Sequence, residues 1–74
     1  MEEKILSILE EVNEEILTYD GSNMIVDGII NSFEIVEIIT NIEEELDIEI
    51  SGKNLVPANF ANKDAIIEMV KRIM

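Results

Sequence analysis

Apolar side chains recur every three to four residues near the N-terminus of the chain, which is the spacing of one face of a helix. Between Glu2 and Thr18 this stripe consists of Ile5, Ile8, Leu9, Val12 and Ile16. Glutamates fill most of the positions outside the stripe, and acidic residues in the first turn suit the positive end of a helix dipole. The pattern predicts an amphipathic helix over Glu2–Thr18.

A second helical pattern begins at Ser32 and ends at Leu46 or Asp47. Its predicted core face consists of Ile35, Ile38, Ile39, Ile42 and Leu46. Asn31 is a good N-cap residue, and Glu34 lies three residues later, where its carboxylate can reach back to form a capping box. The sequence therefore places Ser32 at the first helical position, with its hydroxyl at the rim of a helix end that suits a phosphate.

The opposite face of this second helix carries two apolar side chains, Phe33 and Val36, among polar ones. The whole face consists of Ser32, Phe33, Val36, Glu37, Thr40, Glu43, Glu44 and Asp47. Single exposed apolar residues are normal on protein surfaces. Their combination with a positioned serine and an acidic rim nevertheless indicates a surface on which another protein docks.

The segment from Tyr19 to Ile30 interrupts the helical pattern. It contains the turn signals Asp20-Gly21-Ser22-Asn23 and Asp27-Gly28. Its aliphatic residues are too numerous for a solvated loop, so we expect a long ordered connection that sends Met24, Ile25, Val26, Ile29 and Ile30 into the core. A calcium-binding EF-hand loop is excluded, because counting from Asp20 puts Ile25 where glycine is required and Asn31 where glutamate is required. We expect no metal site.

The C-terminal third predicts one short and one long helix. Asp47–Ile50 is read as an extended connection, and Ser51-Gly52 as a turn. Pro57 suits the first turn of a short helix, and Phe60 is expected to fill the core. The last helix follows Asn62 as its N-cap and turns inward Ala65, Ile66, Met69, Val70 and Ile73. The predicted fold is all-α, a single domain over residues 1–74 with three main helices, one short helix and a long first loop.

Composition narrows the class of protein. The 74 residues include no Cys, so helix packing must stabilise the chain without disulfides. The net charge of −12 argues against nucleic acid and anionic membranes as partners. No apolar run is long enough to span a membrane, and Met1-Glu2-Glu3-Lys4 does not resemble a signal peptide. We expect a cytoplasmic, free-standing monomer.

The acidic residues are also unevenly placed, since no Lys or Arg occurs between Lys4 and Lys53. Like charges stand at helical spacing in the pairs Glu10/Glu14, Glu11/Glu15 and Glu43/Asp47, and each such pair costs a few tenths of a kcal/mol. Two interpretations stay open at this point. The acids either form a solvated surface that keeps the protein soluble, or steer it toward basic partners.

Histidine is absent from the chain, which removes the usual general base and any Ser-His triad. Ser32 is therefore a poor candidate for a self-activated nucleophile. If this hydroxyl takes part in chemistry, another protein must supply the base.

Two stretches resemble the acyl carrier protein family. They are Asp27-Gly28-Ile29-Ile30-Asn31-Ser32-Phe33 and Glu43-Glu44-Glu45-Leu46-Asp47-Ile48-Glu49-Ile50. In that family a serine, usually within Asp-Ser-Leu or Asp-Ser-Phe, opens the second helix, and an acidic Asp-Ile-Glu-Ile type of segment ends it. The likeness covers essentially the whole chain in length, acidity, long first loop and short third helix.

The resemblance implies that Ser32 receives 4'-phosphopantetheine from coenzyme A through a phosphopantetheinyl transferase that uses Mg2+. The arm would carry an acyl or aminoacyl group as a thioester, and the protein would catalyse nothing itself. Partner enzymes that load and process the cargo would meet Phe33, Val36, Glu37, Thr40, Glu43 and Glu44 with basic patches.

One departure from the family pattern is Asn31, where Asp usually precedes the serine. The exchange is nearly neutral for an N-cap, but it removes a charge that the transferase can read, which suggests slower loading or a dedicated transferase. Phe33 in place of Leu resembles D-alanyl and other aminoacyl carriers more than carriers of fatty acid biosynthesis. The alternatives are an unmodified acidic helical adaptor for a basic partner and an enzyme, which the lack of His and Cys disfavours.

Overall fold

The computed structural model describes residues 1–74 and contains helices and connecting segments only. In chain order the elements are α1 (Glu2–Val12), α2 (Glu15–Thr18), α3 (Ser32–Leu46), the 3-10 helices η1 (Gly52–Asn54) and η2 (Pro57–Phe60), and α4 (Lys63–Ile73). The predicted all-α class and the long connection before α3 are confirmed. None of the helices combines the length and the apolarity needed to cross a membrane.

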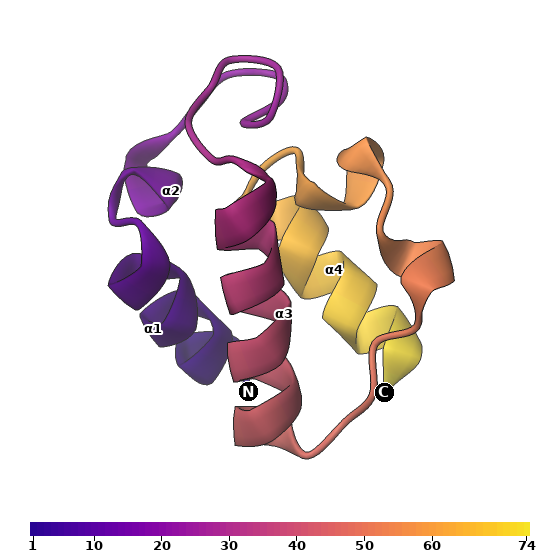
Figure 1. Cartoon of the computed structure of the whole chain (residues 1–74). Coiled ribbons are helices and arrows are strands. Elements are labelled where there is room, and N and C mark those ends of the chain that lie inside the picture. Colours follow the sequence, from indigo (N-terminus) through magenta and orange to yellow (C-terminus); the bar gives the residue numbers. More distant parts are fainter.

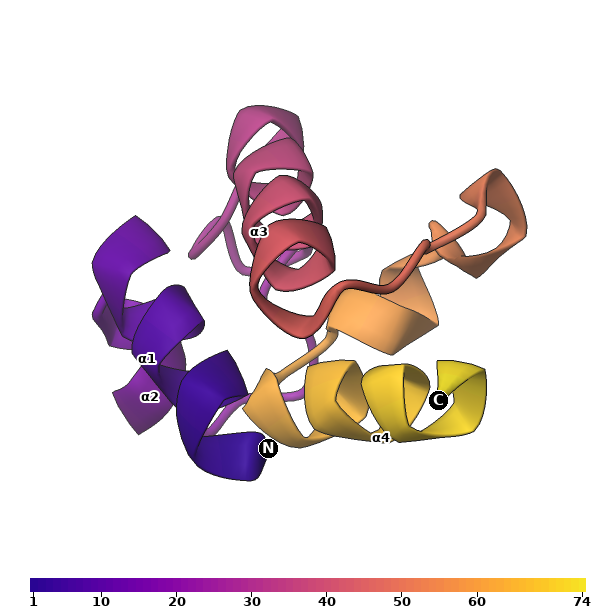
Figure 2. The same cartoon turned by 90° about the horizontal axis from the view of Figure 1, so that it is seen from below.

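Helix α3 lies in the middle of the molecule, with α1 on one side and α4 on the other (Figure 1). Ile38 and Ile42 on its inner face are fully buried. The other three predicted core positions, Ile35, Ile39 and Leu46, are half-buried and pack against the same core. The predicted core face of α3 is therefore correct. Seen from below, α4 runs across the lower right of the view and does not overlap α3 (Figure 2).

The predicted helix over Glu2–Thr18 is wrong in its length, because the chain leaves the helix at Asn13. The backbone of Asn13 is extended, with φ −163° and ψ 106°. Its side-chain Oδ1 accepts a hydrogen bond of 3.0 Å from the backbone N–H of Glu15, where α2 begins. Asparagine competes in this way with helical backbone bonds. The pairs Glu10/Glu14 and Glu11/Glu15 consequently do not lie along one continuous helix.

The connection between α2 and α3 is ordered by its own side chains. The hydroxyl of Tyr19 donates to Asp27 Oδ2 at 2.6 Å and accepts from the backbone N–H of Asn23 at 2.7 Å. A Cβ at Gly21 would collide with that hydroxyl, so any larger residue there would have to displace the Tyr19 side chain. Gly28 takes a positive φ of 75°, which L-residues rarely adopt.

The aliphatic residues of this connection follow the prediction with one exception. Met24 and Ile30 are buried, and Ile25 and Ile29 are half-buried against the core. Val26 is 80% exposed, so its predicted burial is wrong. Its N–H is bonded to the side chain of Asn23 in the turn, which turns Val26 outward.

The C-terminal third follows the prediction closely. Residues 48–50 are extended, and Phe60 at the end of η2 is 1% exposed and fills the core. The Asn62 side chain caps α4 by accepting from the N–H of Ala65 at 2.8 Å. The turn predicted at Ser51-Gly52 continues into η1, and Ile67 of α4 is buried in addition to the predicted positions.

Candidate functional site

The start of α3 is fixed by a reciprocal pair of hydrogen bonds. Asn31 has extended backbone, and its Oδ1 accepts from the N–H of Glu34 at 2.9 Å. Glu34 Oε1 accepts from the N–H of Asn31 at 3.1 Å. The predicted capping box is therefore present, and it sets the direction in which the chain enters the helix.

Ser32 is the first residue of α3, and its side chain is exposed. The capping bonds are made by its neighbours, Asn31 and Glu34, so the hydroxyl of Ser32 stays at the surface. The N-terminal end of a helix carries partial positive charge and free N–H groups. An anionic group attached to this hydroxyl would sit at the favourable end of the dipole.

A third residue, Asn13, contacts this region from the end of α1. Its Nδ2 donates to the carbonyl oxygen of Ile29 at 2.9 Å and to Glu34 Oε2 at 3.3 Å. This role of Asn13 was not predicted from the sequence. An asparagine inside an otherwise helical pattern was the available signal, because Asn favours helix ends over helix interiors.

An apolar pocket of about 220 Å³ lies beside Ser32. Its walls come from the first loop, the start of α3, the segment between η1 and η2, and η2 itself. They consist of Ile25, Ser32, Ile35, Leu55, Val56, Pro57 and Phe60. Leu55 and Val56 are 49% and 44% exposed, so the apolar surface continues outward from the pocket. The pocket could not be predicted from the sequence, because its walls are distant along the chain.

The predicted docking residues divide into two groups in the structure. Phe33 and Val36 are 73% and 60% exposed, and Thr40 and Glu44 are exposed as well. Glu37 and Glu43 are half-buried. The exposed members lie on α3 together with Ser32, so the structure brings an apolar pair, an acidic rim and the serine onto one helix.

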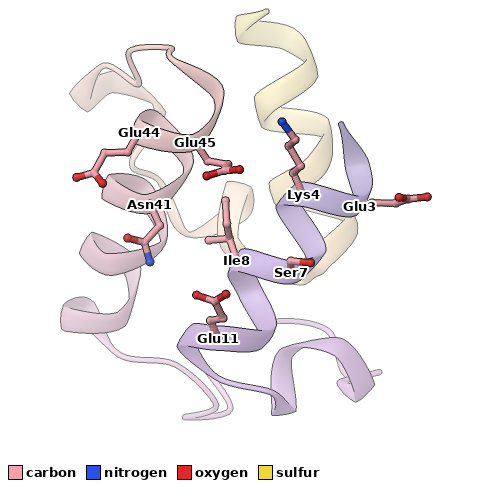
Figure 3. Close-up of a pocket in the computed structure, with 8 residues that line it drawn as sticks. All are labelled: Glu3, Lys4, Ser7, Ile8, Glu11, Asn41, Glu44 and Glu45. Carbon is pink, nitrogen blue, oxygen red and sulfur yellow. The ribbon is translucent and has the colours of Figure 1, made fainter.

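The largest hollow in the molecule is an acidic groove of about 470 Å³ between α1 and α3 (Figure 3). It is lined by Glu3, Lys4, Ser7, Ile8, Glu11, Asn41, Glu44 and Glu45. Asn41 lies about 13 Å along α3 from Ser32, at a rise of about 1.5 Å per residue. The groove is thus remote from the serine. Its carboxylates are not grouped closely enough to hold a metal ion.

Comparison with known proteins supports one family, although no protein-family model matches the chain. The D-alanyl carrier protein of Bacillus cereus strain B4264 is 30% identical over 73 residues, which cover 96% of this chain and 92% of the relative. The D-alanyl carrier protein of Bacillus anthracis strain CDC 684 gives the same identity and coverage.

The chain belongs to the acyl and aminoacyl carrier protein family. The match runs along nearly the whole length of both chains, so it includes the start of α3 as well as the core. The resemblance deduced from the sequence is thereby confirmed. In this carrier protein, the capped and exposed Ser32 stands at the helix start where the resemblance places the attachment serine.

Proposed function

We propose that this carrier protein bears a 4'-phosphopantetheine arm on Ser32 and presents an acyl or aminoacyl group, held as a thioester, to partner enzymes. The observation that carries the proposal is the exposed Ser32 at the capped start of α3, beside an apolar pocket. A buried serine would not be accessible to a transferase.

The residues around Ser32 fit such an arm. The Ser32 hydroxyl supplies the ester oxygen, and the N-terminal end of α3 favours the phosphate charge. The adjoining pocket, with Leu55 and Val56 at its rim, offers an apolar surface to the uncharged part of the arm. When bound, the arm supplies a terminal thiol that forms the thioester with the cargo.

The loading reaction needs a partner, because this chain holds no histidine to act as base. The Ser32 oxygen forms a bond to the pantetheine-side phosphorus of coenzyme A, the bond from that phosphorus to the bridging oxygen breaks, and adenosine bisphosphate leaves. The hydroxyl proton passes to a base on the transferase. We infer that the carrier protein itself catalyses nothing.

For the cargo, we favour an aminoacyl group over a long acyl chain. Two relatives at 30% identity are D-alanyl carrier proteins by name. The pocket beside Ser32 offers about 220 Å³ and is partly open, which suits a short cargo better than a long chain that must be enclosed. A carrier for fatty acid biosynthesis is the alternative, and loading with D-alanine against a fatty acyl group by the matching ligases distinguishes them.

The partners we propose are a phosphopantetheinyl transferase and the enzymes that load and use the cargo. The net charge of −12 favours enzymes with basic docking patches. Phe33 and Val36 would enter apolar contacts, while Glu37, Thr40 and Glu44 surround them with polar groups. We also propose that the protein acts as a monomer in the cytoplasm.

The test of this function is the intact mass after incubation with coenzyme A, Mg2+ and a broad-specificity phosphopantetheinyl transferase. A gain of one phosphopantetheinyl group, absent from Ser32→Ala, is the expected result. If the unaltered protein gains nothing, Asn31→Asp decides the reason. Loading of Asn31→Asp alone would mean a transferase that requires Asp before the serine.

A second candidate function is an unmodified acidic adaptor, favoured by the exposure of Phe33 among carboxylates. An adaptor would bind a basic partner in a salt-sensitive manner, and its binding would survive Ser32→Ala. If neither the unaltered protein nor Asn31→Asp accepts an arm, the adaptor hypothesis replaces the carrier hypothesis.

A further inference from the structure

We propose that Asn13 is a positioning residue for the loading of Ser32, and that its side-chain amide holds the backbone on both sides of the serine in the reactive arrangement. The inference rests on the proposed function. The carbonyl that Asn13 contacts belongs to Ile29, upstream of Ser32, and the carboxylate belongs to Glu34, downstream of it. A single amide group therefore spans the attachment point.

The contact reaches the capping box directly. Glu34 uses Oε1 to accept from the N–H of Asn31 at 3.1 Å and Oε2 to accept from Asn13 Nδ2 at 3.3 Å. Both oxygens of one carboxylate are thus engaged, and bonds to an ionised acceptor are stronger than neutral ones. The orientation of Glu34, and with it the start of α3, depends on Asn13.

Asn13 is itself well anchored. Its N–H donates to the carbonyl oxygen of Leu9 at 2.9 Å, and its Oδ1 accepts from the N–H of Glu15 at 3.0 Å. Leu9 is fully buried against the core. The amide therefore fixes the loop and the start of α3 to the packed body of α1, which a flexible loop alone could not do.

Position matters for this reaction because transfer of a phosphoryl-type group requires the attacking and leaving oxygens to be aligned. A displacement of the order of 1 Å can cost a large part of the rate. Docking, by contrast, would depend on exposed side chains such as Phe33 and Val36, and the hydrogen bonds of the Asn13 side chain go to other residues. Loss of the Asn13 amide should therefore appear in kcat of loading more than in KM.

The first variant is Asn13→Asp. It keeps the shape of the side chain and the oxygen that caps Glu15, but it replaces the amide donor with an oxygen that faces the Ile29 carbonyl and the Glu34 carboxylate. We expect kcat for loading by the transferase to fall by about tenfold, which corresponds to about 1.4 kcal/mol. All variants are assayed well below their melting temperatures, so that each is folded.

The second variant is the double substitution Asn13→Asp/Glu34→Gln, which exchanges donor and acceptor. The amide introduced at position 34 can donate to the carboxylate at position 13 while its oxygen still accepts from the N–H of Asn31. We expect kcat to recover in part, because the contact with position 34 is restored while the Ile29 carbonyl still faces an oxygen. Recovery of kcat at an unchanged KM would assign the effect to the contact between positions 13 and 34 and not to the added charge.

The charge control is Ser7→Asp, which adds the same charge to the exposed side of α1.

A second readout needs no transferase. Amide hydrogen exchange of Asn31 should be faster in Asn13→Asp than in the unaltered protein, and the slower exchange should be restored in the double variant. These results together would support the inference.

The inference is overturned if Asn13→Asp loads at the unaltered rate, if only KM changes, or if Ser7→Asp loses as much. It is also overturned if the double variant shows no recovery of kcat or of exchange protection. Each of these results leaves the proposed function standing, because the unaltered protein still accepts the arm. The proposed function itself is overturned if neither the unaltered protein nor Asn31→Asp is loaded with the arm.

Discussion

The carboxylate of Glu43 accepts a hydrogen bond of 2.8 Å from the backbone N–H of Ile50, seven residues along the chain. Its backbone carbonyl also accepts from the N–H of Ile48, at 3.2 Å. Glu43 therefore fastens the extended segment after α3 to the last turns of that helix. Among the acids of the predicted docking face it has a structural role that its neighbour Glu44 does not share.

Substitution of Glu43 and of Glu44 by alanine should accordingly change the free energy of unfolding by different amounts. Glu43→Ala leaves the N–H of Ile50, a buried residue, without its partner, and should cost about 1–2 kcal/mol of unfolding free energy. Glu44→Ala, at an exposed position, should stay within about 0.5 kcal/mol of the unaltered protein. Urea unfolding of both variants measures the difference, and equal costs would contradict the structural role of Glu43.

Phe33 should contribute to docking and little to stability. It is 73% exposed, so Phe33→Ala should raise KM for the transferase by about tenfold, as loss of an aromatic interface contact does, while the melting temperature hardly changes. Val26→Ala is the matched control, because Val26 is 80% exposed but lies in the first loop, outside the predicted docking face. The same rise of KM in both variants would argue against a specific role for Phe33.

The ends of the chain are joined by an ion pair, in which Lys71 Nζ lies 2.7 Å from Glu2 Oε1. The hydrogen bond to Lys71 lowers the pKa of Glu2 below its ordinary value of 4.5. The same bond raises the pKa of Lys71 above its ordinary value of 10.5. The contribution of Glu2 to the stability of the folded protein is fully present above its ordinary pKa. It is lost as the pH falls through the lowered pKa. The contribution of Lys71 to that stability is fully present below its ordinary pKa. It is lost as the pH rises through the raised pKa.

Lys71→Gln should therefore lower the melting temperature slightly at neutral pH, and the difference should vanish once Glu2 is protonated in strong acid. The effect is small because both side chains are about half exposed and screened by solvent. Lys53→Gln removes the same charge from an exposed position in η1 and serves as the control. A difference that is constant across the acid range would mean that the pair contributes nothing specific.

Divalent cations should stabilise the protein without a preformed site. The net charge is −12, and the acidic groove places Glu11, Glu44 and Glu45 around one hollow. Millimolar Mg2+ should relieve this repulsion and raise the melting temperature, by something on the order of 5 °C. Thermal unfolding with MgCl2, compared with NaCl at equal ionic strength, makes the measurement. An unchanged melting temperature would refute the idea.

The parts of the fold that local rules govern could be predicted from the sequence. The spacing of Ile38 and Ile42 fixed the inner face of α3, and the Asn31 and Glu34 pair defined its start. Phe60 as a core residue followed from its size and its place before the last helix. These features depend on helix period and capping chemistry, which act within a few residues of one another.

The parts that depend on residues distant in sequence could not be predicted. The helix end at Asn13 has a local cause, the bond from the N–H of Glu15 to its Oδ1, but the contacts of its amide with Ile29 and Glu34 depend on the folded chain. The pocket beside Ser32 is assembled from segments that meet only in the folded chain. Glu43 has the same outward pattern as Glu44, and only the path of the chain to Ile50 separates their roles.

Tyr19 gives this protein a built-in optical reporter. It is the one tyrosine in a chain without tryptophan, so the near-ultraviolet emission comes from it almost alone. Its hydroxyl is bonded to the carboxylate of Asp27, five residues before Ser32, and a phenol so bonded emits weakly. Any event that loosens the loop before the serine should brighten the protein, so the state of this loop can be followed in real time without a label.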